Sequence, residues 1–501
     1  MSEMSGDQTF DLLVVGGGIN GVGIARDAAG RGLSVLLVER HDLAGATSSA
    51  SSKLVHGGLR YLEQFEFRLV RESLTEREVL LNAAPHIIRP LRFVLPVHKG
   101  LRPPWMLRTG LFLYDHIGGR KRLPATTTVK RGHDHGLDPL KDSFRMGFEY
   151  SDCWADDARL VVLNARDAAE RGAEIQVGWS LASARRDGGH WMADLKSESG
   201  QTRKVRARGL VNAGGPWVGE VLGLTGAAKK AHHEPRLVKG SHIVVPRLHN
   251  GDQAFTFQND DGRIAFVVPY EQDFSLIGTT DIPYDDDPSA PVASPDEIDY
   301  LCELVSDYLA TPVTKADVVW TYSGVRPLYD DGEANASAVT RDYVFDMDAP
   351  AGQAPLLSIF GGKLTTYRKL AEHAMADLQP ALGFKPGPWT ETGILPGGDL
   401  PNADFEPFAA EQVRRYAWAP ARMVRRMSHA YGTRIERVMG SATKLGDLGE
   451  AFSPDLSEAE LDHMKRDEWT RDAKAALWRR SKLGLHLTAD QQARVAAWFG
   501  A

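Results

Sequence analysis

Three glycines near the start of the chain have the spacing of a dinucleotide-binding turn. Gly16, Gly18 and Gly21 form a G-x-G-x-x-G pattern between an apolar run at 10–15 and a helical segment. The first glycine permits a tight turn, the second lets backbone approach a pyrophosphate, and the third lets helix pack on strand. Unpaired N–H groups at the helix start favour an anion. Glu39, at the end of the next strand-like run, stands where an acid accepts ribose hydroxyls, which predicts FAD or NAD rather than NADP.

A second stretch whose residue types could bind a ligand, SSASSKLVHGGLRYLE at 48–63, follows within ten residues. Its serine-rich first half has the composition of a solvated linker. A linker, however, has no need of a lysine, a histidine, two glycines, an arginine and a tyrosine packed so closely behind. Serine hydroxyls can hydrogen-bond a diphosphate, and paired glycines let backbone lie against a flat ring. We therefore interpret the stretch as a ligand-binding surface.

Length and composition limit the classes of protein that carry these motifs. The 501 residues, 43% of them hydrophobic, suffice for two to four domains. A net charge of −7 gives no general basic field, so nucleic acid is not an expected partner. Cys153 and Cys302 form no CxxC pair, and no histidine–acid cluster has ligand spacing, so we predict no metal site. The start lacks a signal peptide and no apolar run approaches a membrane span, which predicts a cytoplasmic protein.

The elements that position the motifs follow from the hydrophobic pattern. One βαβ unit spans 10–40, and strand-like runs between 236 and 283 predict a largely antiparallel sheet. Ser294 with Glu297 three residues later predicts the start of a helix, and Asp156 is a candidate cap for another. Beyond the proline- and glycine-rich boundary, arginine- and alanine-rich segments with helical spacing predict a helical C-terminal domain.

Eight motifs in consistent order carry a resemblance to a known family. They are GGGINGVG, SSASSKLVHGGLRYLE, GLVNAGGPWV, KGSHIVVPR, IGTTD, YSGVRPL, TRDY and FGGKLTTYRKLAEHA. Together they resemble the FAD-dependent sn-glycerol-3-phosphate dehydrogenases, and most closely the bacterial aerobic, respiratory form. The resemblance runs from about 8 to 395, and the tail is similar to that family's helical C-terminal domain. The chain departs from some relatives in having Gly214 where threonine is common, and in lacking a cysteine-rich tail or a calcium-loop extension.

The resemblance implies an α/β plus α+β architecture with a glutathione-reductase-like FAD domain of the D-amino-acid-oxidase type, an antiparallel substrate domain and a helical C-terminal domain. The FAD domain is expected to be discontinuous. We expect FAD-binding segments at 8–95, 151–235 and 326–385, a substrate or cap excursion at 96–150, the substrate sheet at 236–325 and the helical domain at 388–501.

The resemblance also implies the reaction and its partners. We expect oxidation of sn-glycerol 3-phosphate to dihydroxyacetone phosphate, with hydride transfer to FAD and passage of electrons to a membrane quinone, in glycerol catabolism and respiration. The expected location is the cytoplasm, peripherally at the inner face of the cell membrane. A homodimer is left open.

The FAD contacts are expected in the glycine loop, the serine stretch, the glycine pair and two later turns. The candidates are Gly16, Gly18, Ile19, Asn20, Gly21, Glu39, Ser48, Ser49, Ser52, Lys53, His56, Gly57, Gly58, Ala213, Gly214, Trp217, Gly362, Leu364 and Thr365. Replacing threonine by Gly214 should leave a backbone contact intact.

A phosphate dianion requires fixed cations, and the motifs supply Arg60, Arg326, Arg341 and Lys363. Arginine's planar fork matches phosphate oxygens, whereas lysine contributes a movable point charge. The Arg326 setting is apolar and rigid. The sequence around Arg341 also fits an internal salt bridge with Asp342, and Lys363 also fits an exposed position at a strand-to-helix turn.

His242 is the candidate base, because histidine titrates near neutral pH and its motif is a strand of the expected substrate sheet. Alternation along that strand predicts that Ser241 and His242 face opposite sides. A core histidine remains an alternative, and His56 competes for the role. Thr279 or Thr280 is expected to bond the substrate, or to be a plain strand residue.

The segment 98–122 combines large apolar side chains with flanking basic residues. This pattern is typical of a surface that contacts lipid and anionic headgroups, which a quinone-linked enzyme needs. An internal helix that caps the substrate domain fits the same pattern. Alternative functions for the whole chain are an oxidase that uses dioxygen, an enzyme of the same fold acting on an amino or hydroxy acid, and a non-catalytic FAD-binding protein.

Overall fold

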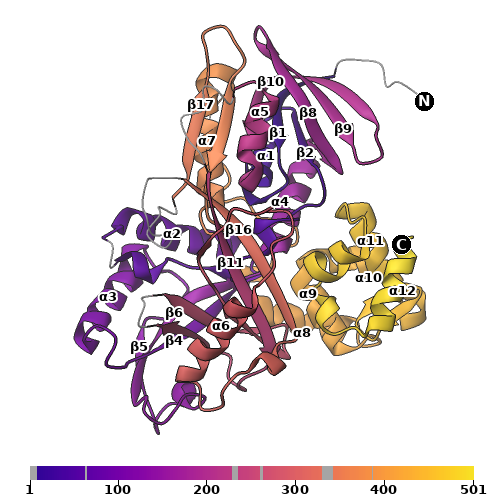
Figure 1. The fold of residues 1–501 in the computed structure, drawn as a ribbon. Helices are drawn as coiled ribbons and strands as arrows, with labels where there is room; N and C mark the ends of the chain where they lie inside the picture. The colour runs from indigo at the N-terminus through magenta and orange to yellow at the C-terminus, as the bar shows by residue number, and fades with distance from the viewer. Residues whose placement is uncertain are drawn as a thin grey trace.

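The strands separate into two large sheets, and the chain passes between them several times (Figure 1). The computed structural model describes residues 8–62, 65–227, 235–259, 263–329, 342–385 and 387–500, apart from the side chain of Arg60. Helices cover both sheets, and a separate group of helices follows at the C-terminal end. The predicted mixture of an α/β unit with an α+β unit is confirmed.

The first sheet has a parallel centre with antiparallel additions at one side. Its spatial order is β17 (Val344–Asp348), β18 (Leu356–Phe360), β10 (Thr202–Asn212), β1 (Gln8–Val15), β2 (Val35–Glu39) and β7 (Glu174–Val177), with β9 (His190–Ser197) paired to β10 and β8 (Trp179–Asp187) paired to β9. β18, β10, β1, β2 and β7 are parallel, so their carboxyl ends meet at one edge. Continuous apolar runs suit these strands because both faces are covered.

One face of this sheet packs against three helices and the other against the β8–β9 hairpin and a short helix. The helices of the first face are α1 (Ile19–Gly30), α4 (Asp157–Glu170) and α7 (Tyr367–Leu382). The short helix is α5 (Val218–Leu224). Asp156 caps α4 as predicted, because its side chain accepts the Arg159 N–H at 3.1 Å.

The second sheet is built from strands that are far apart in sequence. Its order is β15 (Ile282–Pro283), β11 (Pro235–Pro246), β14 (Phe274–Gly278), β13 (Ile264–Tyr270), β12 (Ala254–Gln258), β4 (Ile88–Pro96), β6 (Met146–Ala155) and β3 (Leu54–Val55), with β16 (Trp320–Tyr329) paired to β11 and β5 (Thr127–Lys130) paired to β6. Only the β12–β4 pair within this order is parallel.

The two faces of this second sheet carry different partners. α6 (Pro295–Tyr308) covers one face, on which Ile243 and Val245 lie, and α2 (Phe67–Ala83) and α3 (Pro104–Ile117) cover the other, on which Val244 lies. α6 begins with the predicted capping box of Ser294 and Glu297. Strand alternation therefore separates residues of β11 between a core face and a face directed toward α2 and α3.

Sheet membership divides the chain differently from the expected segments. β3 and all of β4 except Pro96 lie inside the expected FAD segment 8–95, and β6 spans the 150/151 boundary, yet all three belong to the second sheet. β16 likewise runs in that sheet through residue 329, past the expected boundary at 325. The reason is physical: alternation and burial show that a segment is a strand, but they do not show with which strand it pairs.

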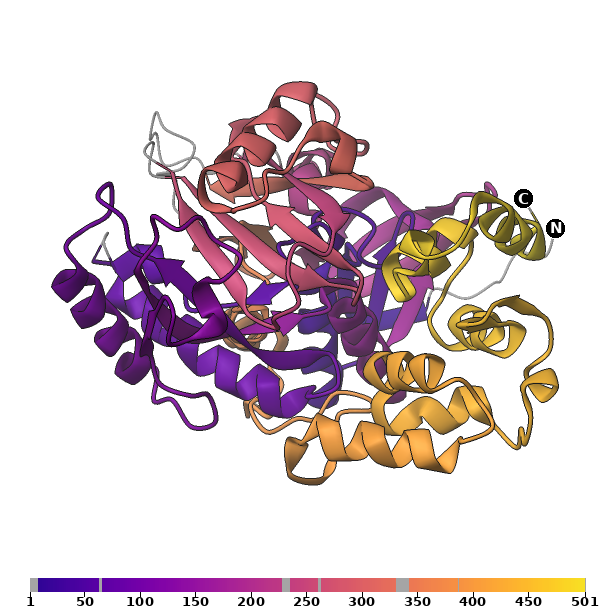
Figure 2. The same cartoon turned by 90° about the horizontal axis from the view of Figure 1, so that it is seen from below.

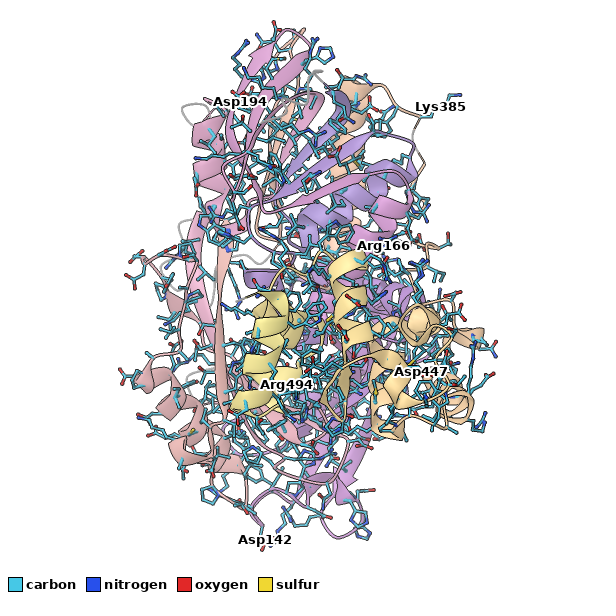
Figure 3. All side chains as sticks on the ribbon, turned by 90° about the vertical axis from the view of Figure 1, so that its right-hand side faces the viewer. Asp142, Arg166, Asp194, Lys385, Asp447 and Arg494 are labelled. Atoms are coloured by element: carbon cyan, nitrogen blue, oxygen red, sulfur yellow. The ribbon has the colours of Figure 1, made fainter. Side chains whose placement is uncertain are left out.

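The C-terminal region is helical, as predicted. Its main elements are α8 (Phe405–Arg415), α9 (Ala421–Tyr431), α10 (Glu436–Met439), α11 (Glu458–Asp467), the π-helix η10 (Ala475–Arg480) and α12 (Ala489–Phe499), with a small hairpin of β19 (Ala451–Ser453) and β20 (Leu456–Ser457). Figure 2 shows these helices as a layer of their own beside the two sheets. In Figure 3, Arg166 of α4 lies next to them, 3.8 Å from the Asp467 carboxylate. Among the described helices, none combines the length and apolar character needed to span a bilayer.

Candidate active site

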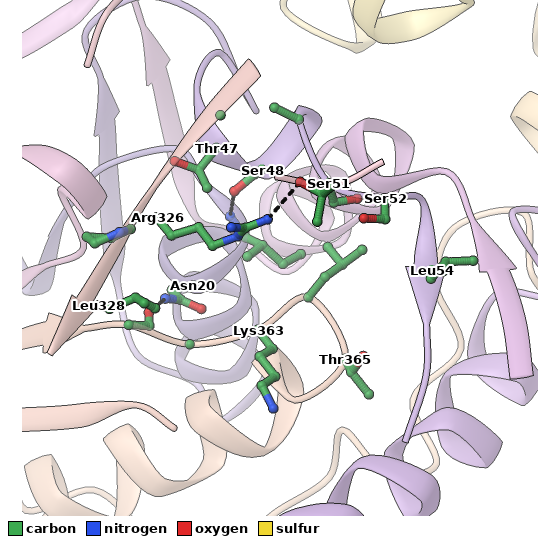
Figure 4. A pocket seen from close by; sticks show the side chains of 18 of the residues that line it. Asn20, Thr47, Ser48, Ser51, Ser52, Leu54, Arg326, Leu328, Lys363 and Thr365 are labelled. Atoms are coloured by element: carbon green, nitrogen blue, oxygen red, sulfur yellow. Dashed lines mark hydrogen bonds between the residues drawn. The ribbon is translucent and has the colours of Figure 1, made fainter. Parts of the chain in front are cut away.

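A cavity of about 960 Å³ lies between the two sheets. The β1–α1 turn, the segment after β2 and the turn after β18 line it from the first sheet, while β13, the β14–β15 turn and β16 line it from the second. Figure 4 shows Asn20, Ser48, Arg326 and Lys363 around this space. The cavity thus brings together motifs that are more than 300 residues apart.

The glycine turn forms one end of the cavity. A Cβ on Gly16, whose φ is +116°, would lie 2.4 Å from the carbonyl oxygen of Ala213, and a Cβ on Gly21 would lie 2.0 Å from the carbonyl oxygen of Gly16. Gly18 caps α1 without a side-chain hydrogen bond, so the helix begins at the cavity wall and the N–H groups of its first turn that follow Ile19 can meet other acceptors. Ser48 Oγ accepts the Ile19 N–H at 3.0 Å.

Glu39 closes this end from β2. Its two carboxylate oxygens accept the N–H groups of Gly17 at 2.7 Å and His41 at 2.8 Å. Burial raises the pKa of Glu39 above its ordinary value. The side chain therefore braces the glycine turn as well as lining the cavity.

The side chain of Asn20 shows whether the cavity suits a bound dinucleotide. Its amide donates to the carbonyl of Gly361 at 3.2 Å, which leaves Oδ1 buried at the cavity wall with no hydrogen-bond partner within the described part of the chain. A buried acceptor without a partner costs free energy, so it favours a ligand that donates a hydrogen bond there. The close glycine contacts, the open helix start and this acceptor fit the predicted cofactor.

The serine stretch splits between the cavity and the protein interior. Ser48 and Ser52 line the cavity, but Ser49 and Lys53 do not. Lys53 is 1% exposed, and its Nζ lies 2.7 Å from Asp157 Oδ2 and donates to the carbonyl of Ser49 at 2.6 Å. Burial lowers the pKa of Lys53, although Asp157 opposes this effect. Lys53 therefore holds the segment from behind, which differs from the predicted contact with the cofactor.

The glycine pair at 57 and 58 is also divided. Gly58, with φ of +74°, lines the cavity together with His56. Gly57 instead donates to the Tyr114 hydroxyl at 2.8 Å, and a Cβ there would lie 2.4 Å from a methyl carbon of Leu74. Gly57 thus allows α2 and α3 to pack close to the backbone that follows β3, and it does not line the cavity.

Two of the candidate cations, Arg326 and Lys363, line the cavity. Arg326 lies 2.5 Å from Asp281 Oδ1 through Nη1 and donates through Nη2 to Thr279 Oγ1 at 3.2 Å. A Cβ on Gly240 would lie 2.5 Å from Nη2, so this glycine makes room for the guanidinium. Lys363 Nζ lies 4.0 Å from the centre of the Tyr61 ring.

Lys363 stands in the turn from β18 to α7. Gly361 and Gly362 have φ of +74° and +98°, which glycine adopts without strain. Leu364 and Thr365 follow in the same turn, and Gly362, Leu364 and Thr365 all line the cavity. The Thr365 hydroxyl accepts the backbone N–H of His56 at 3.3 Å, which ties this turn to the serine stretch.

His242 does not line the cavity. It is 1% exposed, its Nε2 lies 2.9 Å from Ser52 Oγ, and its ring stacks on Tyr322. Burial, followed by Lys53 and Arg326, lowers its pKa well below the ordinary value. Ser241 faces the other side and donates to Glu297, as the alternation predicts. The strand therefore directs His242 beneath the serine stretch, where Ser52 lies between its ring and the cavity.

Ala213, Gly214 and Trp217 line the cavity near the glycine turn, where the guanidinium of Arg40 lies 4.2 Å from the Trp217 ring. Arg341 and the side chain of Arg60 lie outside the described residues. Sequence reasoning missed Asp281, Tyr61, Arg40 and Trp179, which also line the cavity. The sequence could have indicated Asp281 and Tyr61 as site residues, because both belong to motifs that it singles out.

Comparisons with known proteins agree with this geometry. A family model described as FAD dependent oxidoreductase matches residues 11–368. D-erythritol 1-phosphate dehydrogenase of Brucella abortus (strain 2308) is 52% identical, with 99% of each chain covered. Aerobic glycerol-3-phosphate dehydrogenase of Escherichia coli (strain K12) is 51% identical over 98% of this chain and 97% of that one.

A solved structure, the glycerol-3-phosphate dehydrogenase of Bacillus halodurans complexed with FAD, matches with a TM-score of 0.77 at 27% identity and covers 99% of this chain and 95% of that one. The predicted FAD-binding fold of the D-amino-acid-oxidase type and FAD as the cofactor are confirmed. The chain therefore belongs to the FAD-dependent oxidoreductases and, within them, to the glycerol-3-phosphate dehydrogenase family.

Proposed function

We propose that this chain oxidises sn-glycerol 3-phosphate to dihydroxyacetone phosphate and delivers the electrons to a membrane quinone, in glycerol catabolism and respiration. The observation that carries the proposal is one cavity lined both by a nucleotide turn and by the cations Arg326 and Lys363. Relatives of about 50% identity over nearly the full chain are named glycerol-3-phosphate dehydrogenases, which supports the same substrate here.

Arg326 is the proposed anchor for the substrate phosphate. Its guanidinium is oriented by Asp281 and Thr279, so an arriving phosphate meets a group whose plane is already set. Lys363 supplies a second positive charge from the opposite wall. Arg60 and Arg341 remain proposed as further phosphate ligands on the basis of their motifs.

The FAD that this family carries would be held by the glycine turn, by Glu39 at the ribose, by the serine stretch at the diphosphate and by the 362–365 turn beside the flavin. When bound, FAD supplies an acceptor for the hydride from the carbon that bears the reacting hydroxyl. Lys363 and the N-terminal end of α7 would favour negative charge at that place.

The hydroxyl proton needs an acceptor, and His56 is the proposed base. His56 lines the cavity, and its ring stands edge-on to Phe266. His242 reaches the cavity only through the Ser52 hydroxyl, and its lowered pKa makes it a poor proton acceptor near neutral pH. We therefore assign the proton to His56 and a supporting role to the Ser52–His242 pair.

The membrane-contact surface is proposed on α3 and the residues just before α2. Trp105 is 68% exposed, Phe112 is 56% exposed and Phe65 is 78% exposed. Trp105 and Phe65 also line the mouth of the cavity, so the same apolar surface leads toward the site where a lipid-soluble acceptor reacts. Exposed basic side chains flank this surface at Lys99, Arg102, Arg108, Arg120, Lys121 and Arg122. Location at the inner face of the cell membrane follows from this proposal.

D-erythritol 1-phosphate is the second candidate substrate, because the Brucella relative of that name is 52% identical over nearly the whole chain. The two substrates share a phosphate and a secondary alcohol, and differ in length. Both would use the same cations.

One experiment tests the proposal. The purified yellow protein is mixed anaerobically with sn-glycerol 3-phosphate or D-erythritol 1-phosphate, and flavin absorbance is followed before addition of a quinone analogue or air. We expect rapid bleaching by sn-glycerol 3-phosphate and return of colour with the quinone. Bleaching by the erythritol phosphate alone would transfer the proposal to that substrate, bleaching by neither would sink it, and fast recolouring by air alone would indicate an oxidase.

A further inference from the structure

The segment 39–53, here called the cofactor segment, joins β2 to β3 and lines the cavity along much of its length. Apart from Glu39 at its start, its regular structure is the short helix η1 (Thr47–Ser49). No ladder of backbone hydrogen bonds fixes its shape, so side-chain contacts must do so. One of these contacts, at Asp42, leads directly to five consecutive residues of the C-terminal domain, Trp478 to Lys482, here called the clamp. Two more reach the clamp through residues in between.

The first contact joins the clamp to the start of the cofactor segment. Asp42 is 5% exposed, and its Oδ1 lies 2.7 Å from Arg480 Nη2 while its Oδ2 lies 3.1 Å from Arg480 Nη1. Arg479 pairs with the same carboxylate through Nε. Burial acts to raise the pKa of Asp42, but the two guanidiniums lower it below its ordinary value. Asp42 is thus a buried carboxylate whose charge is balanced by the C-terminal domain.

The second contact reaches the other end of the cofactor segment through stacked rings. The Trp478 ring lies 4.6 Å from Trp320 of β16, and Trp320 lies 5.1 Å from Tyr322. The Tyr322 hydroxyl donates to the carbonyl of Ser51 at 2.7 Å, and its ring stacks on His242 at 4.7 Å. His242 is the residue that bonds the cavity-lining Ser52.

The third contact passes through the start of α4. Lys482 Nζ lies 3.7 Å from Asp156 Oδ1, and Lys482 is 2% exposed. The neighbouring Asp157 binds Lys53 Nζ at 2.7 Å and accepts the Ser51 hydroxyl at 2.7 Å, while the N–H of Ala155 donates to the carbonyl of Lys53. The clamp therefore approaches the cofactor segment near both of its ends.

We infer that the C-terminal helical domain supports the FAD site from outside, and that the clamp, with Asp42 as its main partner, positions the cofactor segment in the conformation that binds FAD. Neither Asp42 nor the clamp residues line the cavity, so their effect passes through the segment they hold. They are positioning residues. Loss of the clamp should weaken FAD binding, and the chemistry of molecules that still carry FAD should be unchanged.

The test measures FAD binding directly. Apoprotein of Asp42→Asn, Arg480→Gln and Trp478→Leu is titrated with FAD, with quenching of flavin fluorescence giving the Kd. We expect each variant to raise the Kd by about tenfold or more, the range by which outer partners alter ligand affinity at metal sites. Hydrogen–deuterium exchange in the apoprotein should be faster in peptides covering 40–53. With saturating FAD, substrate KM should match the parent within twofold.

Arg434→Gln is the matched control. It breaks a second bidentate ion pair of the C-terminal domain, in which Arg434 lies 2.5 and 2.6 Å from the two carboxylate oxygens of Glu170. Glu170 ends α4 and lies outside the cofactor segment. We expect Arg434→Gln to lower Tm without changing the FAD Kd. An FAD Kd within twofold of the parent in Asp42→Asn and in Trp478→Leu would overturn the inference, even if both variants lowered Tm. Because no substrate is used to measure Kd, the result is independent of the proposed reaction.

Discussion

Arg326 and Asp281 form an ion pair in the wall of the cavity, with Nη1 2.5 Å from Oδ1. Because Thr279 accepts a hydrogen bond from the other terminal nitrogen, both outer nitrogens of the guanidinium are held by residues of the β14–β15 turn. An arginine fixed in this way loses little conformational entropy when it binds an anion. Because the Asp281 carboxylate is paired with Arg326, it does not prevent a phosphate from binding in the cavity.

Replacing Arg326 by glutamine should raise the KM for the phosphate substrate by about 10–100-fold. A hydrogen bond to a charged group contributes about 1.5–3 kcal/mol, and about 1.4 kcal/mol corresponds to a factor of ten. Bound FAD per chain should not change. Steady-state kinetics and the flavin-to-protein absorbance ratio measure the two quantities, with Arg185→Gln on the exposed side of β8 as the control. An unchanged KM would remove Arg326 from the phosphate site.

Replacing Lys363 by methionine should slow flavin reduction by about 100-fold, the loss found when one donor to a developing negative charge is removed. Lys363→Arg keeps the charge and should recover part of the rate. Anaerobic stopped-flow absorbance with saturating substrate measures the step without the quinone. Equal rates for both variants and the parent would mean that the lysine only packs on Tyr61.

The two histidines near the cavity should behave differently. His56→Asn should slow flavin reduction by about 100-fold or more, since it removes the proposed base. His242→Asn should have a much smaller effect, because the pKa of His242 already lies well below 6.5 through burial and the nearby Lys53 and Arg326. The pH dependence of the reduction rate between pH 5 and 8 distinguishes them, and loss of a titration step only in His242→Asn would reverse the assignment.

His86 should make the fold sensitive to mild acid. Burial, followed by Arg159 and His429, lowers the pKa of His86 to about 3 in the folded chain. Between pH 6.5 and 3 the unfolded chain binds the extra proton and the folded chain does not, so stability is complete above 6.5 and falls as pH decreases, by up to about 1.4 kcal/mol per unit. His86→Gln should flatten this slope in urea unfolding at pH 7, 6 and 5. The exposed His133 provides the control, and a slope that His86→Gln leaves unchanged would contradict the prediction.

Phe112→Glu and Trp105→Glu should weaken binding to vesicles of anionic phospholipid by about tenfold each. Transfer of a large apolar side chain contributes about 1.5–3 kcal/mol, and a new carboxylate adds repulsion from the headgroups. Activity with a water-soluble acceptor should stay within twofold. Leu445→Glu, at an exposed position of the C-terminal domain, is the control in a vesicle co-sedimentation assay. Unchanged sedimentation would move the lipid contact away from α3.

The parts of the fold and of the site that sequence could predict are those in which one short stretch determines its own structure. The glycine turn, Glu39 and the Ser294 capping box are of this kind, because their partners lie a few residues away or in the next strand. Lys53 is of the other kind. Its partner Asp157 is 104 residues distant, and nothing in the serine stretch indicates that the lysine points away from the cofactor.

The surroundings of His242 depend on a distant segment as well. Its strand and its orientation opposite to Ser241 were predicted, but the element that covers His242 was not, and this element is the serine stretch itself. The placement of β4 and β6 likewise depended on pairing partners that alternation does not specify. Local patterns thus predicted the individual strands and turns that line the cavity more reliably than the way in which these elements pack against one another.

The order of the strands in the first sheet also governs when the enzyme can mature during its synthesis. β1 leaves the ribosome first, yet the turn that follows β18, with Lys363, emerges only after about seven tenths of the chain, and the clamp emerges later still. A nascent chain therefore exposes its glycine turn long before the opposite wall exists. The complete FAD site can therefore form only after most of the chain has been synthesised.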